Sequence, residues 1–410
     1  MSESPSRPAA LPPDAVLVHI GPRKTGSTAI QSSFFEVAEQ LRSCGVVYPG
    51  TNARHHFAVW NLVGWSPKMR NDPPPRAWDD LVREVQAHPD ERVVISSEHL
   101  SVAGPRAIER LVSDFGAERV HVVLVVRPLD KLLPSQWQER VKSMQTVDYE
   151  SWLGQVLARK GGPHARQFWR GHGLRRVLNR WAARVPPERI VAVVNRGGDR
   201  RFLHSTFEAL LDLEPGTLPT VATENSSLPW SATELLRRVN HDHAGSGRTP
   251  RAYFRIVRRG PLKEMLRAEP TELDELAPGF PASAIEPLRV LSTDRRDTLY
   301  KAGVRIVGDP DDLLAPDNLR AWKSAPAAIS LDLATAAVVG SLRVSDRSQE
   351  RLSRLLRETR QQRRALKRLQ AKAPAKVGPA ALPTAALVAE VRRRAGRRAT
   401  RPFRRDRSTP

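Results

Sequence analysis

Two glycines, a lysine and three hydroxyl side chains are grouped within a short segment near the N-terminus, residues 21–28. The segment follows an apolar run over residues 15–20 and precedes a helical pattern over residues 29–41. The N-terminus of a helix offers unpaired N–H groups and about half a positive charge, and glycines let the backbone approach a ligand closely. The segment therefore predicts an anion-binding site. The groups that would form it are Gly21, Lys24, Gly26, Ser27 and Thr28.

The order of these residues indicates which anion is bound. In nucleoside-triphosphate loops the lysine follows the last glycine, and the next hydroxyl residue holds Mg²⁺. Here Lys24 precedes Gly26 in the sequence Lys-Thr-Gly-Ser-Thr. This order resembles the 5′-phosphosulfate loop of sulfotransferases that use 3′-phosphoadenosine 5′-phosphosulfate (PAPS). The resemblance implies that PAPS is bound by Arg23, Lys24, Thr25, Gly26, Ser27 and Thr28. No metal is expected at this site, because Lys24 and the backbone supply the positive charge.

A second pair of residues fits the same family. Arg127 follows the apolar run over residues 122–126, and Ser135 comes eight positions later. Sulfotransferases carry an arginine and a serine with this spacing, and the two bind the 3′-phosphate, which the product adenosine 3′,5′-bisphosphate retains. An arginine can offer paired donors to a phosphate, and a hydroxyl two turns into the following helix can face the same way. Pro128 and Pro134 depart from the family's pattern and can delay or bend that helix.

Transfer of a sulfuryl group to a hydroxyl requires charge stabilisation and a base for the hydroxyl proton. We expect Lys24 to stabilise the charge. Glu98 and His99 end another predicted strand, and Glu98 is the preferred base, since several glycan-modifying sulfotransferases use a glutamate; a structural ion pair with an arginine is the alternative for Glu98. His55 and His56 compete for the role of base or of acceptor binding. Adjacent histidines on a helix point about 100° apart, so at most one of these two faces the site.

Other catalytic patterns are missing from the sequence. There is no His-Glu-x-x-His, no Gly-x-Ser-x-Gly and no Gly-x-Gly-x-x-Gly after a strand. The single cysteine, Cys44, excludes an internal disulfide and a multi-cysteine metal site. We interpret residues 240–243 as a helix-end loop and the aspartates at 309–312 as a structural turn, because neither has metal-ligand spacing.

Apolar β-branched runs alternate with helical patterns along most of the chain. This alternation predicts an α/β fold with a P-loop-NTPase-like, mostly parallel sheet flanked by helices, a helical cap and a basic C-terminal extension. The predicted strands are 15–20, 92–96, 120–126 and 190–194, and the predicted helices are 29–41, 105–115, 130–144, 174–183 and 202–211. The expected organisation is a disordered leader at 1–14, a sulfotransferase domain at 15–325 with its helical cap at 230–325, a charged helical segment at 326–370 and a disordered arginine-rich tail at 371–410.

Charge is concentrated at the C-terminus. The 410 residues carry a net charge of +22, of which residues 341–410 contribute +16 and all preceding residues only +6. Such an excess suggests an anionic partner for the tail, either a membrane surface or a polyanion, and we do not expect sequence-specific nucleic-acid binding. The start lacks a signal-peptide layout, and no apolar run approaches the roughly 20 residues of a membrane span. We expect a cytoplasmic protein, either free or peripheral at the inner face of the membrane.

The function predicted from these features is transfer of the sulfuryl group of PAPS to a hydroxyl acceptor. The resemblance extends over residues 16–314 and includes softer matches at 224–230 and 303–313 to the bacterial, carbohydrate-type branch. The acceptor would be a sugar, a glycolipid or a small metabolite. Two alternatives remain open: a P-loop kinase or NTPase, and a polyanion-binding protein with a decayed sulfotransferase site.

Overall fold

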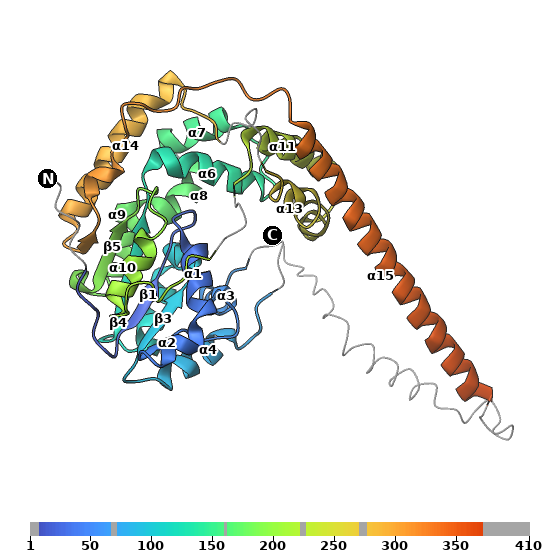
Figure 1. Ribbon diagram of the computed structural model, residues 1–410, viewed down its shortest axis with the longest axis horizontal. Helices are drawn as coiled ribbons and strands as arrows, with labels where there is room; N and C mark the ends of the chain where they lie inside the picture. The colour runs from blue at the N-terminus through green and yellow to red at the C-terminus, as the bar shows by residue number, and fades with distance from the viewer. Residues whose placement is uncertain (1–7, 67–71, 160–161, 222–226, 270–276, 372–410) are drawn as a thin grey trace, which may run out of the picture. The chain divides into compact units, whose positions relative to one another are not determined.

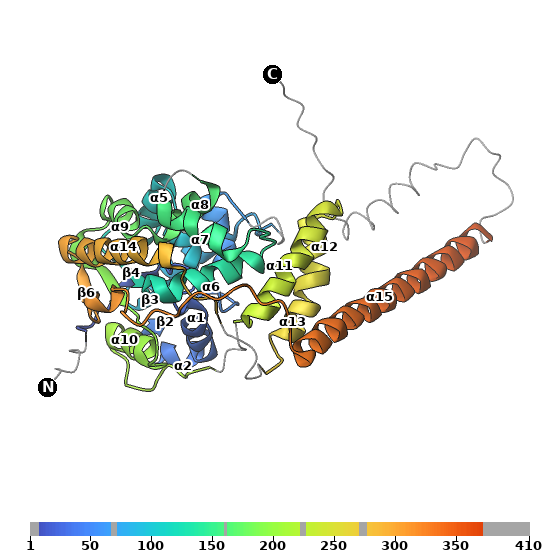
Figure 2. The same ribbon diagram turned by 90° about the horizontal axis from the view of Figure 1, so that it is seen from above.

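The computed structural model describes residues 8–66, 72–159, 162–221, 227–269 and 277–371 (Figures 1 and 2). The softer match at 224–230 lies partly outside the described residues, and the tail from 372 onward lies wholly outside them. The chain divides into two compact units, one up to Ser345 and the other from Asp346. No helix in the described ranges combines the length and the apolar character needed to cross a membrane.

Six parallel strands form one open sheet in the first unit, in the order β2-β3-β1-β4-β5-β6. The strands are β1 (Val16–His19), β2 (Val46–Val47), β3 (Arg92–Ser96), β4 (Val120–Val126), β5 (Ile190–Val194) and β6 (Arg305–Val307). The four longest are almost entirely buried and rich in valine and isoleucine, as strands covered on both faces must be. The prediction of an α/β fold with a mostly parallel sheet is confirmed.

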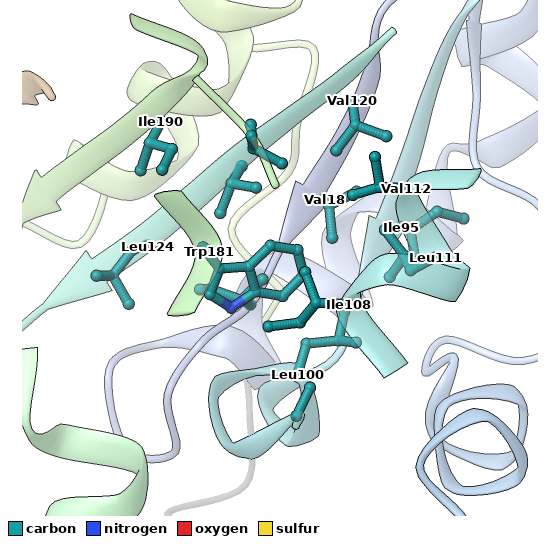
Figure 3. Close-up of a cluster of buried hydrophobic side chains, with 14 of the residues drawn as sticks. Val18, Ile95, Leu100, Ile108, Leu111, Val112, Val120, Leu124, Trp181 and Ile190 are labelled. Atoms are coloured by element: carbon teal, nitrogen blue, oxygen red, sulfur yellow. The ribbon is translucent and has the colours of Figure 1, made fainter. Parts of the chain in front are cut away.

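Helices cover both faces of the sheet. One face packs against α3 (His56–Val63), α4 (Ala77–Gln86), α5 (Pro105–Phe115) and α9 (Leu174–Ala182). The opposite face packs against α1 (Ser27–Glu36), α2 (Ala38–Arg42) and α10 (Phe202–Leu210). Alternate residues of β1 face the two layers. Val18 faces the first layer, where Trp181 lies at the centre of the cluster (Figure 3). Leu17 faces the second layer.

A third apolar cluster lies among helices beyond the sheet and is rich in buried aromatic side chains, including Trp137, Trp152 and Trp230. Its helices are α6 (Leu129–Val141), α7 (Tyr149–Ala158), α8 (Pro163–His172), α11 (Trp230–Gly245), α12 (Pro250–Tyr253), α13 (Pro261–Met265) and α14 (Ala282–Lys301). The start of α15 (Leu331–Ala371) also joins this cluster through the fully buried Leu333. From residue 345 to 368 every side chain of α15 is exposed, whereas Leu333 and Val344 nearer its start are buried, so the charged segment predicted over 326–370 is solvated only in its later part.

The structure corrects three boundaries. The prediction of a disordered leader is wrong for residues 8–14, because Leu11 is buried and its N–H donates to the Leu210 carbonyl at 2.8 Å. The helix predicted over 29–41 is divided at Val37, whose backbone angles leave the helical region. The region predicted as a helical cap also contains β6, which extends the sheet beside β5.

Candidate anion-binding site

The loop from Gly21 to Thr28 connects β1 to α1 at the carboxyl edge of the sheet. Two of its residues must be glycines. Gly21 and Gly26 have φ angles of 76° and 109°, and a Cβ at Gly21 would lie 2.7 Å from the Cα of Glu98. A Cβ at Gly26 would lie 2.4 Å from the Leu203 side chain. Lys24 also has a positive φ of 65°, which is uncommon for a residue with a side chain.

Side chains from three other elements bind the carbonyl oxygens of this loop. Arg127, directly after β4, donates from Nη1 to the Lys24 carbonyl at 3.0 Å. Gln136 on α6 donates to the Arg23 carbonyl at 2.9 Å, and Asn195, directly after β5, donates to the Thr25 carbonyl at 3.3 Å. These bonds hold the backbone in one conformation, and the strained φ of Lys24 is maintained by them.

The N–H groups of the loop have no such partners. Within the described part of the chain, no backbone N–H from Arg23 to Thr28 donates a hydrogen bond. The Ser27 hydroxyl is buried and likewise has no partner among the described residues. Thr25 differs, because its hydroxyl donates to the Pro22 carbonyl at 2.6 Å, and Thr28 is exposed with Arg54 3.5 Å away. Unpaired donors at a helix N-terminus are the groups that bind an oxyanion.

Lys24 forms an ion pair that the sequence did not predict. Its Nζ lies 3.2 Å from Oε2 of Glu139 on α6. Burial alone would raise the pKa of Glu139, but the positive charges of Lys24, Lys142 and Arg258 lower it to about 2. Glu139 is therefore ionised at neutral pH and competes with any bound anion for Lys24.

More positive charges surround this pair. Burial and the charges of Lys24 and Arg258 lower the pKa of Lys142 to about 7, although Glu139 opposes the shift. Burial and the charge of Arg23 lower the pKa of Arg140 to about 10. Glu139 and Arg140 belong to α6, and Lys142 lies at its C-terminal boundary. Arg258 belongs to the π-helical turn Phe254–Arg258. The spacing of Gln136, Glu139 and Arg140 on one face of a predicted helix was the signal that could have identified them.

Arg127 and Ser135, predicted to bind a 3′-phosphate, lie on either side of the start of α6. Arg127 is half-buried, and burial lowers its pKa while Asp130 opposes the shift. Ser135 is half-buried on α6, and its hydroxyl has no hydrogen bond to the described residues. Pro128 directly precedes the first residue of α6, and Pro134 lies inside the helix, which continues past it. The helix is therefore neither delayed nor ended by these prolines.

Glu98 and His99 lie in the 3₁₀ turn Glu98–Val102 that follows β3, beside the loop. His99 Nε2 is 3.2 Å from Nη2 of Arg23, which must act as the donor. Burial would raise the pKa of Glu98, but the charges of His99, Arg23 and Arg54 lower it overall. Glu98 is thus held as a carboxylate, able to accept a proton, although a low pKa makes it a weaker base.

His55 and His56, the competing candidates, lie at the start of α3. Both ring nitrogens of His55 contact the backbone: Nε2 is 2.8 Å from the Pro49 carbonyl, and Nδ1 accepts from the Ser96 N–H at 3.0 Å. This arrangement requires a neutral ring, and burial lowers the pKa of His55 accordingly. In this conformation His55 has no nitrogen left to accept a proton. His56 packs with its ring 4.7 Å from that of Trp60.

The two segments interpreted as structural have structural contacts. The prediction of a helix-end loop at 240–243 is wrong, because these residues lie inside α11, where Asn240 donates to the carbonyls of Val141 and Gln145 at 2.7 and 2.9 Å. The carboxylate of Asp309 accepts from the N–H of Asp311 at 2.9 Å and caps the 3₁₀ turn Pro310–Leu313.

The strand order places this site where open α/β sheets bind ligands. β1 and β4 are neighbours in the sheet, but the strand that follows β1 in the chain lies towards one edge of the sheet and the strand that follows β4 lies towards the other edge. In open α/β sheets, ligands bind at the carboxyl ends of two neighbouring strands that diverge in this way. Neither a protein-family model nor a curated protein sequence matches the chain. Fold and site together define an open, parallel α/β protein whose carboxyl edge carries a loop of unpaired N–H groups.

Proposed function

We propose that this protein is a sulfotransferase that moves the sulfuryl group of PAPS to a hydroxyl acceptor, on a P-loop-type sheet. The observation that carries the proposal is the run of unpaired N–H groups from Arg23 to Thr28, combined with the buried, unpartnered hydroxyl of Ser27. These donors suit the 5′-phosphosulfate end of PAPS, and the placement of Lys24 before Gly26 resembles the sulfotransferase order.

Lys24 would supply the charge in the reaction. The acceptor oxygen forms a bond to sulfur while the bond from sulfur to the 5′-phosphate oxygen breaks, and negative charge develops on that oxygen. In the ligand-free chain Nζ of Lys24 is paired with Glu139, so binding of PAPS exchanges one anionic partner for another. Lys24 and the loop N–H groups would together stabilise the negative charge on the 5′-phosphate oxygen, so the proposed reaction needs no metal.

Arg127 and Ser135 would bind the 3′-phosphate. Arg127 uses Nη1 to hold the Lys24 carbonyl, which leaves its other nitrogens to reach a phosphate. The Ser135 hydroxyl, without a partner among the described residues, comes from the helix that follows. An arginine–phosphate contact is a charge-assisted bond worth about 1.5–3 kcal/mol.

Glu98 would take the proton of the acceptor hydroxyl. It is a carboxylate beside Gly21, at the same sheet edge as the loop. His99 would act with it by fixing Arg23. A sugar, a glycolipid or a small metabolite could supply the hydroxyl.

Ligand binding separates this proposal from a kinase or NTPase. By calorimetry, adenosine 3′,5′-bisphosphate should bind roughly ten- to hundredfold more tightly than adenosine 5′-phosphate, because only the former engages Arg127. Arg127→Gln should remove that preference while an amide still holds the Lys24 carbonyl. Lys24→Ala should weaken both nucleotides. Arg189→Ala, at the opposite edge of the sheet, is the matched control. Tight ATP–Mg²⁺ binding without preference for the 3′-phosphate would contradict the proposal.

Transfer itself is measured with labelled PAPS and a cell extract as the source of acceptor. Label should enter an acceptor with the unaltered chain and not with Lys24→Ala. Glu98→Gln should lower turnover by ~10²–10⁴ and leave bisphosphate affinity unchanged, since loss of a base affects the transition state alone. An unchanged turnover in this variant would show that Glu98 is not the base.

A further inference from the structure

A cavity of about 650 Å³ lies beside α9 and α14, and no residue of the Gly21–Thr28 loop lines it. We call it the α9–α14 pocket. Its apolar wall includes Trp169, Leu174 and Leu291. Its volume is typical of sites for small molecules. Six arginines line it: Arg159, Arg175, Arg176, Arg180, Arg184 and Arg295.

The positive charge of this pocket is only partly neutralised. Asp294 is its single acidic lining residue, and it accepts from Arg159 at 3.3 Å and from Arg175 at 3.0 Å. Arg184 pairs with Glu109, which lies outside the lining, at 3.4 Å. The remaining arginines have no acidic partner within 4 Å in the described part of the chain. An anion entering the pocket would therefore meet an excess of guanidinium groups.

Arg295 is the most unusual of these residues. Its side chain is 5% exposed, and neither Nε nor Nη1 has a hydrogen-bond partner among the described residues. Burial lowers its pKa to about 10, with Asp294 opposing the shift, so it is still charged at neutral pH. The nearby His172 is buried, and burial together with the charge of Arg295 lowers its pKa well below the usual range. His172 therefore adds no second charge beside Arg295.

A buried cation without a partner destabilises a protein unless something pairs with it. The Nε of Arg180 is also buried and unpartnered within the described ranges, although its Nη2 contacts the carbonyl oxygens of Ser101 and Arg170. Two of the arginines that line the cavity thus have buried guanidinium nitrogens without hydrogen-bond partners among the described residues. Arginine donors match the tetrahedral oxyanions of sulfate and phosphate esters, and the apolar wall suits an aromatic or aliphatic body.

We propose that the α9–α14 pocket binds a small molecule that carries a sulfate or phosphate monoester on an apolar body. Arg295 pairs with the oxyanion at the floor of the pocket, and Trp169 contacts the body. The lining shares no residue with the Gly21–Thr28 loop. Arg295 also borders a gap of about 10 Å³ beside Thr25 and Arg127, which is too small for a ligand.

The probes are 4-nitrophenyl sulfate and 4-nitrophenyl phosphate, with neutral 4-nitroanisole as the uncharged analogue, titrated into the full chain by calorimetry. Both esters should bind saturably and 4-nitroanisole at least tenfold more weakly. The tighter of the two esters identifies the preferred oxyanion. Lys24→Ala should change their affinity by less than twofold. If Lys24→Ala abolishes binding, the esters occupy the Gly21–Thr28 loop and the pocket proposal is wrong.

Arg295→Met should weaken ester binding at least tenfold. Arg296→Met, the same change at the next residue, where the side chain pairs with Asp297 and Asp311 instead, should stay within twofold. Without ligand, Arg295→Met should unfold at the same temperature as the unaltered chain or higher, because it removes an uncompensated buried charge. If Arg295 served only to stabilise the fold, Arg295→Met would lower the unfolding temperature.

Arg176→Met provides a second variant, one that changes no buried side chain. Arg176 is exposed at the rim of the pocket, so its loss should leave folding intact and weaken ester binding at least threefold. Full ester affinity in both Arg295→Met and Arg176→Met would overturn the proposal. So would the absence of saturable ester binding to the unaltered chain.

Discussion

Single buried charges determine how the candidate site responds to pH. Lys24, Glu139 and Lys142 lie in one cluster at α6, where a carboxylate is shared between more than one cation. Glu139 is stabilised in its charged form, while Lys142 is destabilised in its charged form. The two shifts have the same origin, an excess of positive charge in a buried place, and this excess is available to a bound anion.

Lys142→Met should stabilise the ligand-free protein in a pH-dependent way. The pKa of Lys142 is about 7 in the folded chain against its usual 10.5, so the unfolded chain binds more protons between these values. Its destabilising effect is fully present below pH 7 and disappears as the pH rises to 10.5. The difference in unfolding free energy between variant and unaltered chain, measured in urea from pH 6 to 10, should be largest at pH 6. A difference independent of pH would contradict the assignment.

At the scale of elements, the loop after β1 is shaped by its neighbours. Carbonyl oxygens of Arg23, Lys24 and Thr25 are bound by side chains from α6, from the end of β4 and from the end of β5. Packing against Leu203 of α10 leaves room only for a glycine at position 26. The loop's conformation is thus present before any ligand binds, which lowers the cost of binding.

Gly26→Ala should lower the free energy of unfolding by about 1–3 kcal/mol, because the new methyl group meets Leu203 and φ is positive. Gly64→Ala is the control, since Gly64 also has a positive φ but no atom within 4 Å of the added Cβ. Denaturant unfolding of both variants separates the two effects. Equal losses would mean that backbone strain alone, and not packing against α10, restricts position 26.

For the whole molecule, charge and fold are divided between different parts of the chain. Residues 346–410 hold 20 basic and five acidic residues, a net +15 of the total +22. The described side chains of this unit are all exposed, and the three apolar clusters contain no residue beyond Ala337. The described residues of the basic extension therefore add charge and are not among the residues of the three apolar clusters.

A chain ending at Ser345 should keep its thermal unfolding midpoint within about 2 °C, because no buried residue of the clusters is lost. If the extension binds anionic surfaces, the same chain should no longer sediment with vesicles rich in acidic lipid, since each basic residue near such a surface adds about 1 kcal/mol. Sedimentation of the full chain should weaken with salt. Equal sedimentation of both chains would show that the extension has no such role.

The sequence alone determined the parallel sheet and the position of the loop. Strands buried on both faces must be continuous apolar runs, and β1, β3, β4 and β5 could be located from that pattern. Glycines at positive φ before a helix carry a similarly local signal, so the residues from Gly21 to Thr28 were found without the fold.

Only the tertiary structure decided the contacts around that loop. Glu139 is 115 residues from Lys24 along the chain, and no periodicity shows that the two meet. The two-residue strand β2 and the edge strand β6 are too short to give a pattern, and Leu11 is buried by contacts made far along the sequence. His55 was a candidate base by residue type, yet both its nitrogens contact backbone groups. Local patterns report which face of an element is covered, whereas the partner of a charge depends on how distant elements pack.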